Sequence, residues 1–246
     1  MVRSDDSSAF GFHTIVFVLG PPGCGKGTLC KAVTGRPDIN EAHYTHLSLG
    51  DHLRELCKQD VKTQDRNVDY DKIREHLKEN KLLPADVLIP VLEHKMGDRF
   101  STTWLIDGFP RNLETALAFE KTASTVLPLP SLTTCLGQLG KPDMVIVLEC
   151  ERATAEARFL KRGRESADDK ERFARRYAEY VENMKAIREH YRKQGDIRLE
   201  TICTDMPLED SLGDFGDSLL SVSALDRDGV EKEWAAIQEA MGKGHS

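Results

Sequence analysis

The chain has 246 residues, of which 39% are hydrophobic and 30% are charged, and its net charge is −7. This length is enough for one α/β domain with a full hydrophobic core. An acidic chain of this kind is not an electrostatic nucleic-acid binder, and no apolar run approaches the roughly 20 residues that span a membrane. We therefore expect neither nucleic acid nor a membrane among its partners.

The cysteines and the N-terminal residues bear on the cellular compartment. None of the six cysteines forms a Cys-x-x-Cys pair or a zinc-type spacing, which predicts reduced thiols. Residues 1–12 predict a flexible arm, and their acidic start lacks the hydrophobic segment of a secretory peptide. These features favour a cytoplasmic protein, with the nucleus also possible, and we expect a monomer.

The first predicted unit is a strand, a glycine-rich loop and a helix. Residues 15–19 are apolar and rich in β-branched side chains, which predicts a buried strand. The next nine residues are Gly20, Pro21, Pro22, Gly23, Cys24, Gly25, Lys26, Gly27 and Thr28, and a helix then runs to about Thr34. Such a loop brings backbone N–H groups, a helix N-terminus and the Lys26 charge onto a phosphate. A glycine-rich hairpin that binds nothing is the less favoured alternative.

The segment after residue 46 predicts a separate group of helices. Gly50 and Asp51 predict a turn or helix cap, and the apolar residues after them lie on one helical face. Arg54 is expected near the start of this helix, where its charge opposes the dipole, so a functional role competes with a solvated surface arginine. Residues 70–80 predict an amphipathic helix with a mostly wet surface and little core of its own. Pro84 is expected to be the first residue of the next helix.

A second buried strand, residues 103–106, is followed by Asp107, Gly108, Phe109, Pro110 and Arg111. In open α/β sheets, ligands bind beyond the carboxyl ends of the strands, so Asp107 is expected at the same sheet edge as the glycine-rich loop. A carboxylate there suits the water shell of Mg²⁺ bound to ATP. A simple turn aspartate is the alternative.

The rest of the chain continues the alternation of strands and helices. Residues 144–148 and 197–203 predict two further strands, with helices near residues 208–222 and 229–242. The alternation predicts an α/β fold of the P-loop NTPase type, a doubly wound parallel sheet flanked by helices. The apolar stripe from Phe173 to Tyr191 predicts core packing without chemistry. A basic cluster precedes and overlaps it, comprising Arg158, Lys161, Arg162, Arg164, Arg172, Arg175 and Arg176.

Taken in order, these motifs resemble the adenylate kinase/UMP–CMP kinase family over residues 14 to about 220. They are the loop at residues 20–28, residues 46–54, residues 107–112, residues 160–163, Asp168-Asp169 and residues 176–180. The resemblance implies transfer of the γ-phosphoryl group of Mg-ATP to a nucleoside monophosphate. It also implies a core of residues 13–46, 97–160 and 172–222, a monophosphate-binding insert at 47–96 and a short lid at 161–171.

The resemblance also implies roles for single residues. It places ATP on Gly20, Pro21, Pro22, Gly23, Cys24, Gly25, Lys26, Gly27, Thr28 and Arg162. It places the monophosphate on Ser48, Leu49, Gly50, Arg54, Lys81, Leu82, Leu83, Gly108, Arg111, Asn112, Thr115 and Arg176. The implied catalytic residues are Lys26, Arg54, Asp107, Arg111, Arg162 and Arg176, with Asp168 and Asp169 orienting the lid arginines. No direct protein ligand to a metal is expected, since Asp107 would hold Mg²⁺ through water.

Departures from the family pattern bear on rate and base choice. The lid lacks one family arginine, for which Arg164 or Arg172 would have to substitute. Leu49 and Thr115 stand where adenylate kinases carry threonine and glutamine, which argues against AMP. UMP/CMP kinases carry asparagine at the position of Thr115, but Asn112 matches their Phe-Pro-Arg-Asn, so we favour UMP or CMP over AMP. Adenylate kinase proper stays an alternative. So does a nucleotide-binding relative without turnover that acts as an interaction module; a GTPase switch is disfavoured because no Asn-Lys-x-Asp motif occurs.

Overall fold

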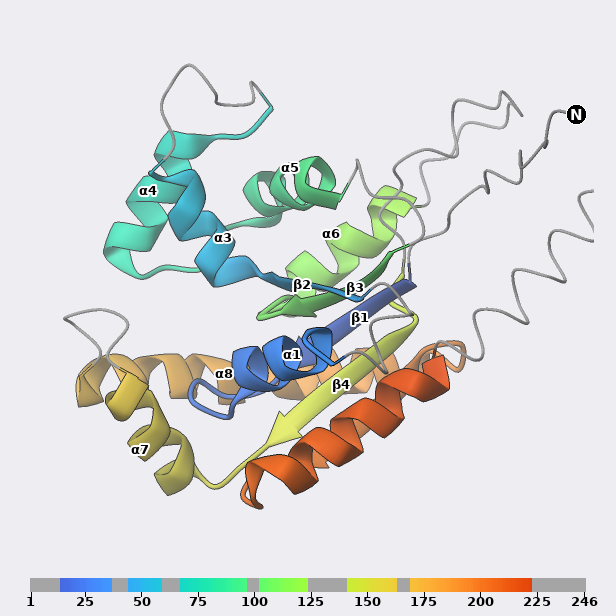
Figure 1. Ribbon diagram of the computed structural model, residues 1–246. Coiled ribbons are helices and arrows are strands. Elements are labelled where there is room, and N and C mark those ends of the chain that lie inside the picture. The colour runs from blue at the N-terminus through green and yellow to red at the C-terminus, as the bar shows by residue number, and fades with distance from the viewer. Residues whose placement is uncertain are drawn as a thin grey trace, which may run out of the picture.

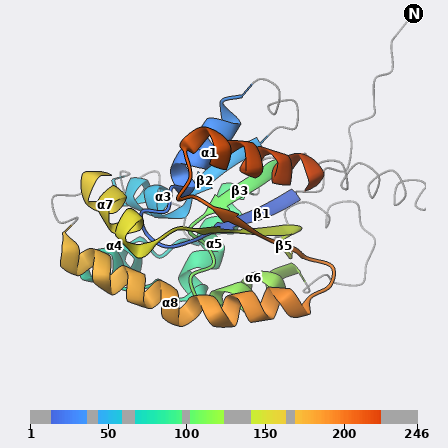
Figure 2. The same cartoon turned by 90° about the horizontal axis from the view of Figure 1, so that it is seen from below.

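The computed structural model describes residues 14–36, 44–58, 67–96, 102–123, 141–162 and 169–222. They form a five-stranded parallel sheet with helices on both faces (Figures 1 and 2), as predicted. The strand order is β2-β3-β1-β4-β5. The strands are β1 (Thr14–Leu19), β2 (Tyr44–Ser48), β3 (Thr103–Asp107), β4 (Met144–Glu149) and β5 (Arg198–Cys203).

The helices connect these strands as crossovers. They are α1 (Lys26–Thr34), α3 (Leu49–Leu56), α4 (Tyr70–Glu79), α5 (Ala85–Met96), α6 (Leu113–Ala123), α7 (Arg152–Arg162) and α8 (Lys170–Lys193), with a last described helix at residues 208–222. The predicted helix at 229–242, Asp168 and most of the predicted lid lie outside the described residues. The division into core, monophosphate-binding insert and lid stays a prediction.

The central strand β1 is buried on both faces because its side chains alternate between two hydrophobic clusters. Ile15 and Phe17 pack in a cluster with side chains of α5, α6 and α8, whereas Val16 and Val18 pack with α1 and the helix at residues 208–222. Figure 2 shows α1 and the last helix on one side of the sheet and α6 and α8 on the other. A hydrophobic cluster and a layer of helices therefore cover each face of the sheet.

Strand β2 was not predicted. Its sequence, Tyr44-Thr45-His46-Leu47-Ser48, lacks the continuous apolar run of the central strands. It lies at the edge of the sheet, where one side of the strand has no neighbouring strand among the described residues and polar side chains are tolerated. An edge strand of this composition carries a weak sequence signal.

The helices after β2 differ from the predictions in three details. Helix α3 begins at Leu49 with Ser48 as its N-cap residue, so Gly50 lies inside the helix, and the prediction of a cap there is wrong. Arg54 falls in the last turn, not the first, and a cation there favours the helix dipole. Pro84 precedes α5, and its carbonyl accepts from the N–H groups of Val87 and Leu88 at 3.2 and 3.1 Å.

Helix α4 packs more firmly than its charged sequence suggests. Ile73 is fully buried, and Val68 and Tyr70 are each 6% exposed. All three belong to the hydrophobic cluster that also contains the β1 and β3 side chains of that face. In Figure 1, α3, α4 and α5 lie together on one side of the sheet. This group of helices therefore shares the main core.

Three further features concern the described residues alone. The five cysteines among them, Cys24, Cys30, Cys57, Cys150 and Cys203, are free thiols, as predicted, and Cys135 lies outside. Within these residues no helix has the length and apolar character to cross a membrane. The same part of the chain contains no cluster of three or more His, Cys, Asp or Glu side chains suited to a metal ion.

Candidate active site

The carboxyl ends of three adjacent strands meet at one edge of the sheet. Asp107, the last residue of β3, is in register with Val18 of β1 on one side and Ser48 of β2 on the other. The glycine-rich loop leaves β1 at Gly20 and turns into α1 at Lys26. The sheet therefore brings the loop, Ser48 and the Asp107 carboxylate together, as the sequence predicted for Asp107.

The loop after β1 has a backbone that only glycine adopts comfortably. Gly23 and Gly25 have φ values of 86° and 100°. A Cβ atom on Gly23 would lie 2.0 Å from the carbonyl oxygen of Ala155, so α7 packs directly against the loop. The ammonium group of Lys26 donates to the carbonyl oxygens of Gly20 and Pro21, both at 2.9 Å. Its charge is thus held over the loop, where phosphate oxygens can replace these acceptors.

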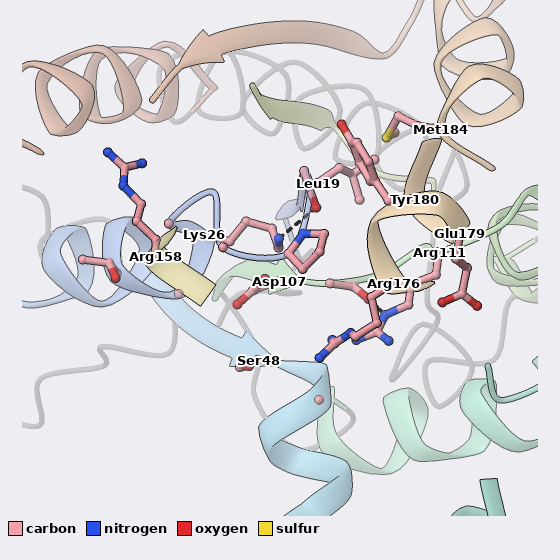
Figure 3. A pocket seen from close by; sticks show the side chains of 18 of the residues that line it. Leu19, Lys26, Ser48, Asp107, Arg111, Arg158, Arg176, Glu179, Tyr180 and Met184 are labelled. Carbon is pink, nitrogen blue, oxygen red and sulfur yellow. Dashed lines mark hydrogen bonds between the residues drawn. The ribbon is translucent and has the colours of Figure 1, made fainter. Parts of the chain in front are cut away.

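A first cavity of about 320 Å³ opens beside the loop. The loop residues on its wall are Gly20, Pro22, Gly23, Gly25, Lys26, Gly27 and Thr28. Pro21 and Cys24 are buried and do not line it. All six predicted catalytic residues do: Lys26, Arg54, Asp107, Arg111, Arg162 and Arg176. Figure 3 shows Lys26 and Asp107 on one side of this cavity and Arg111 and Arg176 on the other.

A second cavity of about 340 Å³ lies next to the first and is mostly apolar. Its apolar wall consists of Leu49, Leu53, Leu77, Leu82, Leu83, Leu88 and Phe109. Lys81, Asn112 and Thr115 add polar groups, and Arg172 of the basic cluster also faces it. The predicted monophosphate residues therefore line this cavity or the first one, since Ser48 and Gly108 border the first.

Three arginines belong to both cavities. Arg54, Arg111 and Arg176 line each of them, together with Gly50 and Glu179. A Cβ atom on Gly50 would lie 3.6 Å from the Arg54 guanidinium and 3.7 Å from that of Arg111, so the glycine borders the gathered charges. Like charges at close range repel unless an anion or carboxylate lies among them. Glu179 and Asp51, which pairs with Arg54, are two carboxylates beside three arginines, so positive charge remains and the junction of the two cavities is suited to an anion.

Buried groups hold the arginines in place. Arg111 donates from Nε to the Gly108 carbonyl at 3.1 Å. The guanidinium groups of Arg162 and Arg176 lie 5.0 and 5.8 Å from the ring centre of Phe159, a fully buried side chain of α7. Cations are attracted to an aromatic face at such distances. Phe159 is thus a common platform for two of the predicted catalytic arginines.

Asp169 is placed differently from its predicted role. Its carboxylate accepts from the Arg172 N–H at 2.7 Å and caps the N-terminus of α8. It lines neither cavity, and its described contact is with the backbone, not with a lid arginine. Arg164 and Asp168 lie outside the described residues.

Sequence reasoning missed several residues of the site. His46 was not singled out, yet its Nε2 lies 3.6 Å from the Asp107 carboxylate, and both side chains are close to nine-tenths buried. The apolar stripe predicted core packing for Tyr180, Met184 and Ile187, but all three also line the first cavity. Figure 3 shows Tyr180 and Met184 there. Burial raises the pKa of Tyr180, which keeps its phenol neutral. An apolar stripe indicates that a helix face is covered but not what covers it.

Comparisons with known proteins agree with this geometry. The adenylate kinase family model matches residues 18–196 of the chain. Among curated proteins, UMP-CMP kinase 3 of Arabidopsis thaliana is 32% identical over 186 residues, which cover 75% of this chain and 79% of the relative. The UMP-CMP kinases of Mus musculus and Homo sapiens are 31% and 30% identical over 194 residues, covering 75% of this chain and 86% of each relative.

The fold and the cavities define a P-loop nucleotide-binding protein with two adjoining sites. With the family match over most of its length, the chain belongs to the adenylate kinase family of nucleoside monophosphate kinases. It is accordingly a phosphotransferase.

Proposed function

We propose that the protein transfers the γ-phosphoryl group of Mg-ATP reversibly to UMP or CMP. ATP would occupy the first cavity, with its phosphates on the glycine-rich loop and Lys26, and the monophosphate would occupy the second. The observation that carries the proposal is the sharing of Arg54, Arg111 and Arg176 by both cavities. A donor and an acceptor phosphate would meet at these three side chains.

The reaction needs alignment and charge neutralisation more than covalent chemistry. An oxygen of the monophosphate attacks the γ-phosphorus, the bond from that phosphorus to the bridging oxygen breaks, and ADP leaves with the bridging oxygen. Lys26 and the loop N–H groups would hold the β- and γ-phosphates. The planar guanidinium groups of Arg54 and Arg111 suit two-point contact with the acceptor phosphate. Arg162 and Arg176 would neutralise the charge of the group in transfer.

Magnesium fits this arrangement as an ion carried in with ATP. Mg²⁺ keeps several water molecules and needs only one or two carboxylates besides phosphate oxygens. Asp107 is a carboxylate of that kind, 8% exposed, on the wall of the first cavity near Lys26. It would hold the ion through water, and His46 behind it would fix the position of the carboxylate. When bound, the ion would supply positive charge that offsets the charge of the phosphates.

The preference for a pyrimidine rests on the second cavity and on the relatives. Leu49 and Thr115 line that cavity where adenylate kinases carry threonine and glutamine, and Asn112 beside them matches the Phe-Pro-Arg-Asn of UMP/CMP kinases, which carry asparagine in place of Thr115. The curated relatives reported above are UMP-CMP kinases. Adenylate kinase activity is the alternative. Both readings place the base against the apolar wall.

The test is ADP release from Mg-ATP with a panel of AMP, CMP, UMP, dCMP and GMP. Multiple turnovers with UMP or CMP above AMP support the proposal. Faster turnover of AMP keeps the kinase and overturns the pyrimidine assignment. ATP binding without turnover of any monophosphate would favour a relative that has lost activity and serves as an interaction module.

A further inference from the structure

The first turn of α6 fixes the side chain of Asn112. Asn112 stands before Leu113 as the N-cap of this helix, and its Oδ1 accepts from the Thr115 backbone N–H at 2.9 Å. The Thr115 hydroxyl lies 2.8 Å from the same Oδ1 and 3.0 Å from the Asn112 carbonyl oxygen. Thr115 is only 2% exposed, so water does not compete for these bonds.

These contacts determine which end of the amide faces the second cavity. A backbone N–H can only donate, so the atom opposite the Thr115 N–H must be the amide oxygen. The amide nitrogen Nδ2 is then left over, and among the described residues no acceptor is bonded to it. Asn112 and Thr115 both line the second cavity. Asn112 therefore offers a ligand hydrogen-bond donors and no amide acceptor.

We propose that Thr115 makes Asn112 a fixed donor that selects a uracil ring, so that UMP is preferred over CMP and AMP. This inference rests on the proposed function, in which the second cavity holds the monophosphate. UMP and CMP share the carbonyl at position 2 and differ at position 4, where uracil has a carbonyl and cytosine an amino group. Adenine likewise carries an exocyclic amino group. Position 4 lies across the ring from the ribose, so with the phosphate at the arginine junction its exocyclic group is the part of the base that extends farthest into the second cavity.

The rest of the wall strengthens the selection. Among the described residues that line the second cavity, Glu179 is the only carboxylate, and it lies at the arginine junction shared with the first cavity. Lys78 and Lys81, which line only the second cavity, are donors, whereas His76 and Asn80 on the same wall can also accept. An amino group brought to Asn112 would face another donor and lose its hydrogen bonds to water. Unpaired polar groups of this kind strongly disfavour the wrong base.

Asn112→Asp is the sharpest test because it changes one atom of the side chain. The aspartate keeps an oxygen for the Thr115 N–H and hydroxyl and caps a helix as well as asparagine, so the melting temperature should hold. Its second oxygen replaces the donor Nδ2 with an acceptor. We expect kcat/KM for UMP over CMP to be about tenfold or more in the natural protein and to fall by about tenfold or more in the variant. The added charge affects both substrates alike and cancels in the ratio.

Two matched variants separate selection from helix capping. Asn112→Ser keeps a capping oxygen but has no amide, so the UMP/CMP ratio should approach one. Thr115→Val keeps the backbone N–H and the side-chain shape but lacks the hydroxyl, so the ratio should fall by less than in Asn112→Asp. The inference would be overturned if the natural protein preferred CMP. It would also be overturned if the variants lowered kcat/KM for UMP and for CMP by the same factor.

The selection of UMP over CMP can fail while the proposed kinase function holds, and it can be tested even if that function fails. Turnover of UMP and CMP at equal rates keeps the kinase and overturns the selection. If no monophosphate is phosphorylated, calorimetric dissociation constants of UMP and CMP still test the selection. Tighter binding of UMP supports it, and equal constants overturn it.

Discussion

The two cavities are about equal in volume but differ in construction. The first is walled by loop backbone and charged side chains, and its shape depends on loop glycines with positive φ, of which Gly23 packs against α7. The second has an apolar wall of leucines from α3, α4, α5 and the segment between α4 and α5, with charged side chains at its borders and a small polar group at the start of α6. Only the arginine junction belongs to both. We infer that charge in the first cavity sets the rate and that shape and hydrogen bonding in the second set the choice of substrate.

The largest effect is expected from Lys26, which lines the first cavity alone. Lys26→Met should lower kcat by about a thousandfold, because a positioned charge on the transferring phosphates is lost while the side-chain stem is kept. Lys31→Met on the exposed side of α1 is the matched control and should leave kcat unchanged. Steady-state ADP release measures both. A near-normal kcat in Lys26→Met would break the assignment of rate to the first cavity.

Substitution at the arginine junction is expected to have a smaller effect, which is divided between KM and kcat. Arg111→Ala should raise KM for the monophosphate and lower kcat, for about a hundredfold loss in kcat/KM, since Arg111 borders both cavities. KM for ATP should change less. Arg74→Ala, which removes an α4 arginine outside both cavities, is the control. An unchanged KM for the monophosphate would move the acceptor site away from the junction.

The contrast between the cavities also explains what the sequence could reveal. The loop could be predicted because residues 20–28 are adjacent in sequence. Their glycines all serve one local purpose, which is to let the backbone approach a phosphate closely. Asp107 was predicted because the ends of parallel strands share an edge. Each of these inferences uses neighbours along the chain or a rule of sheet topology.

Other features depend on contacts between distant segments and carry little local signal. Strand β2 is a polar edge strand, and nothing in the sequence around His46 shows that this side chain lies beside Asp107. The sequence pattern predicts Arg54 at the start of its helix because a glycine and an aspartate at positions 50 and 51 favour a helix cap, whereas Arg54 lies in the last turn. Phe159 of α7 supports Arg162 of the same helix and Arg176 of α8. The leucine wall likewise comes from α3, α4, α5 and the segment between α4 and α5, and it could not be assembled from one stretch of sequence.

The stability of the second cavity's wall is expected to depend on pH through His52 of α3. Burial, with Lys95 and His94 nearby, lowers the pKa of His52 from 6.5 to about 4. Between these values the unfolded chain binds the additional proton, so stability should fall as the pH drops from 6.5 towards 4. The contribution is on the order of 1–2 kcal/mol. Urea unfolding of the natural protein and of His52→Gln at pH 7 and pH 5 measures it, and an equal loss in both proteins would contradict it.

The smallest effect is expected at Asp169, and it decides between two roles for that residue. If Asp169 only caps α8, Asp169→Ala should cost about 1 kcal/mol of stability, and Asp169→Ser, which retains a capping oxygen without the charge, should restore most of it. Both variants should then keep kcat, because the cap lies outside both cavities. If the carboxylate orients lid arginines, as the family pattern implies, both variants should lose kcat alike, since neither carries the charge. Melting temperature and kcat measured on the two variants together separate helix capping from a part in phosphoryl transfer.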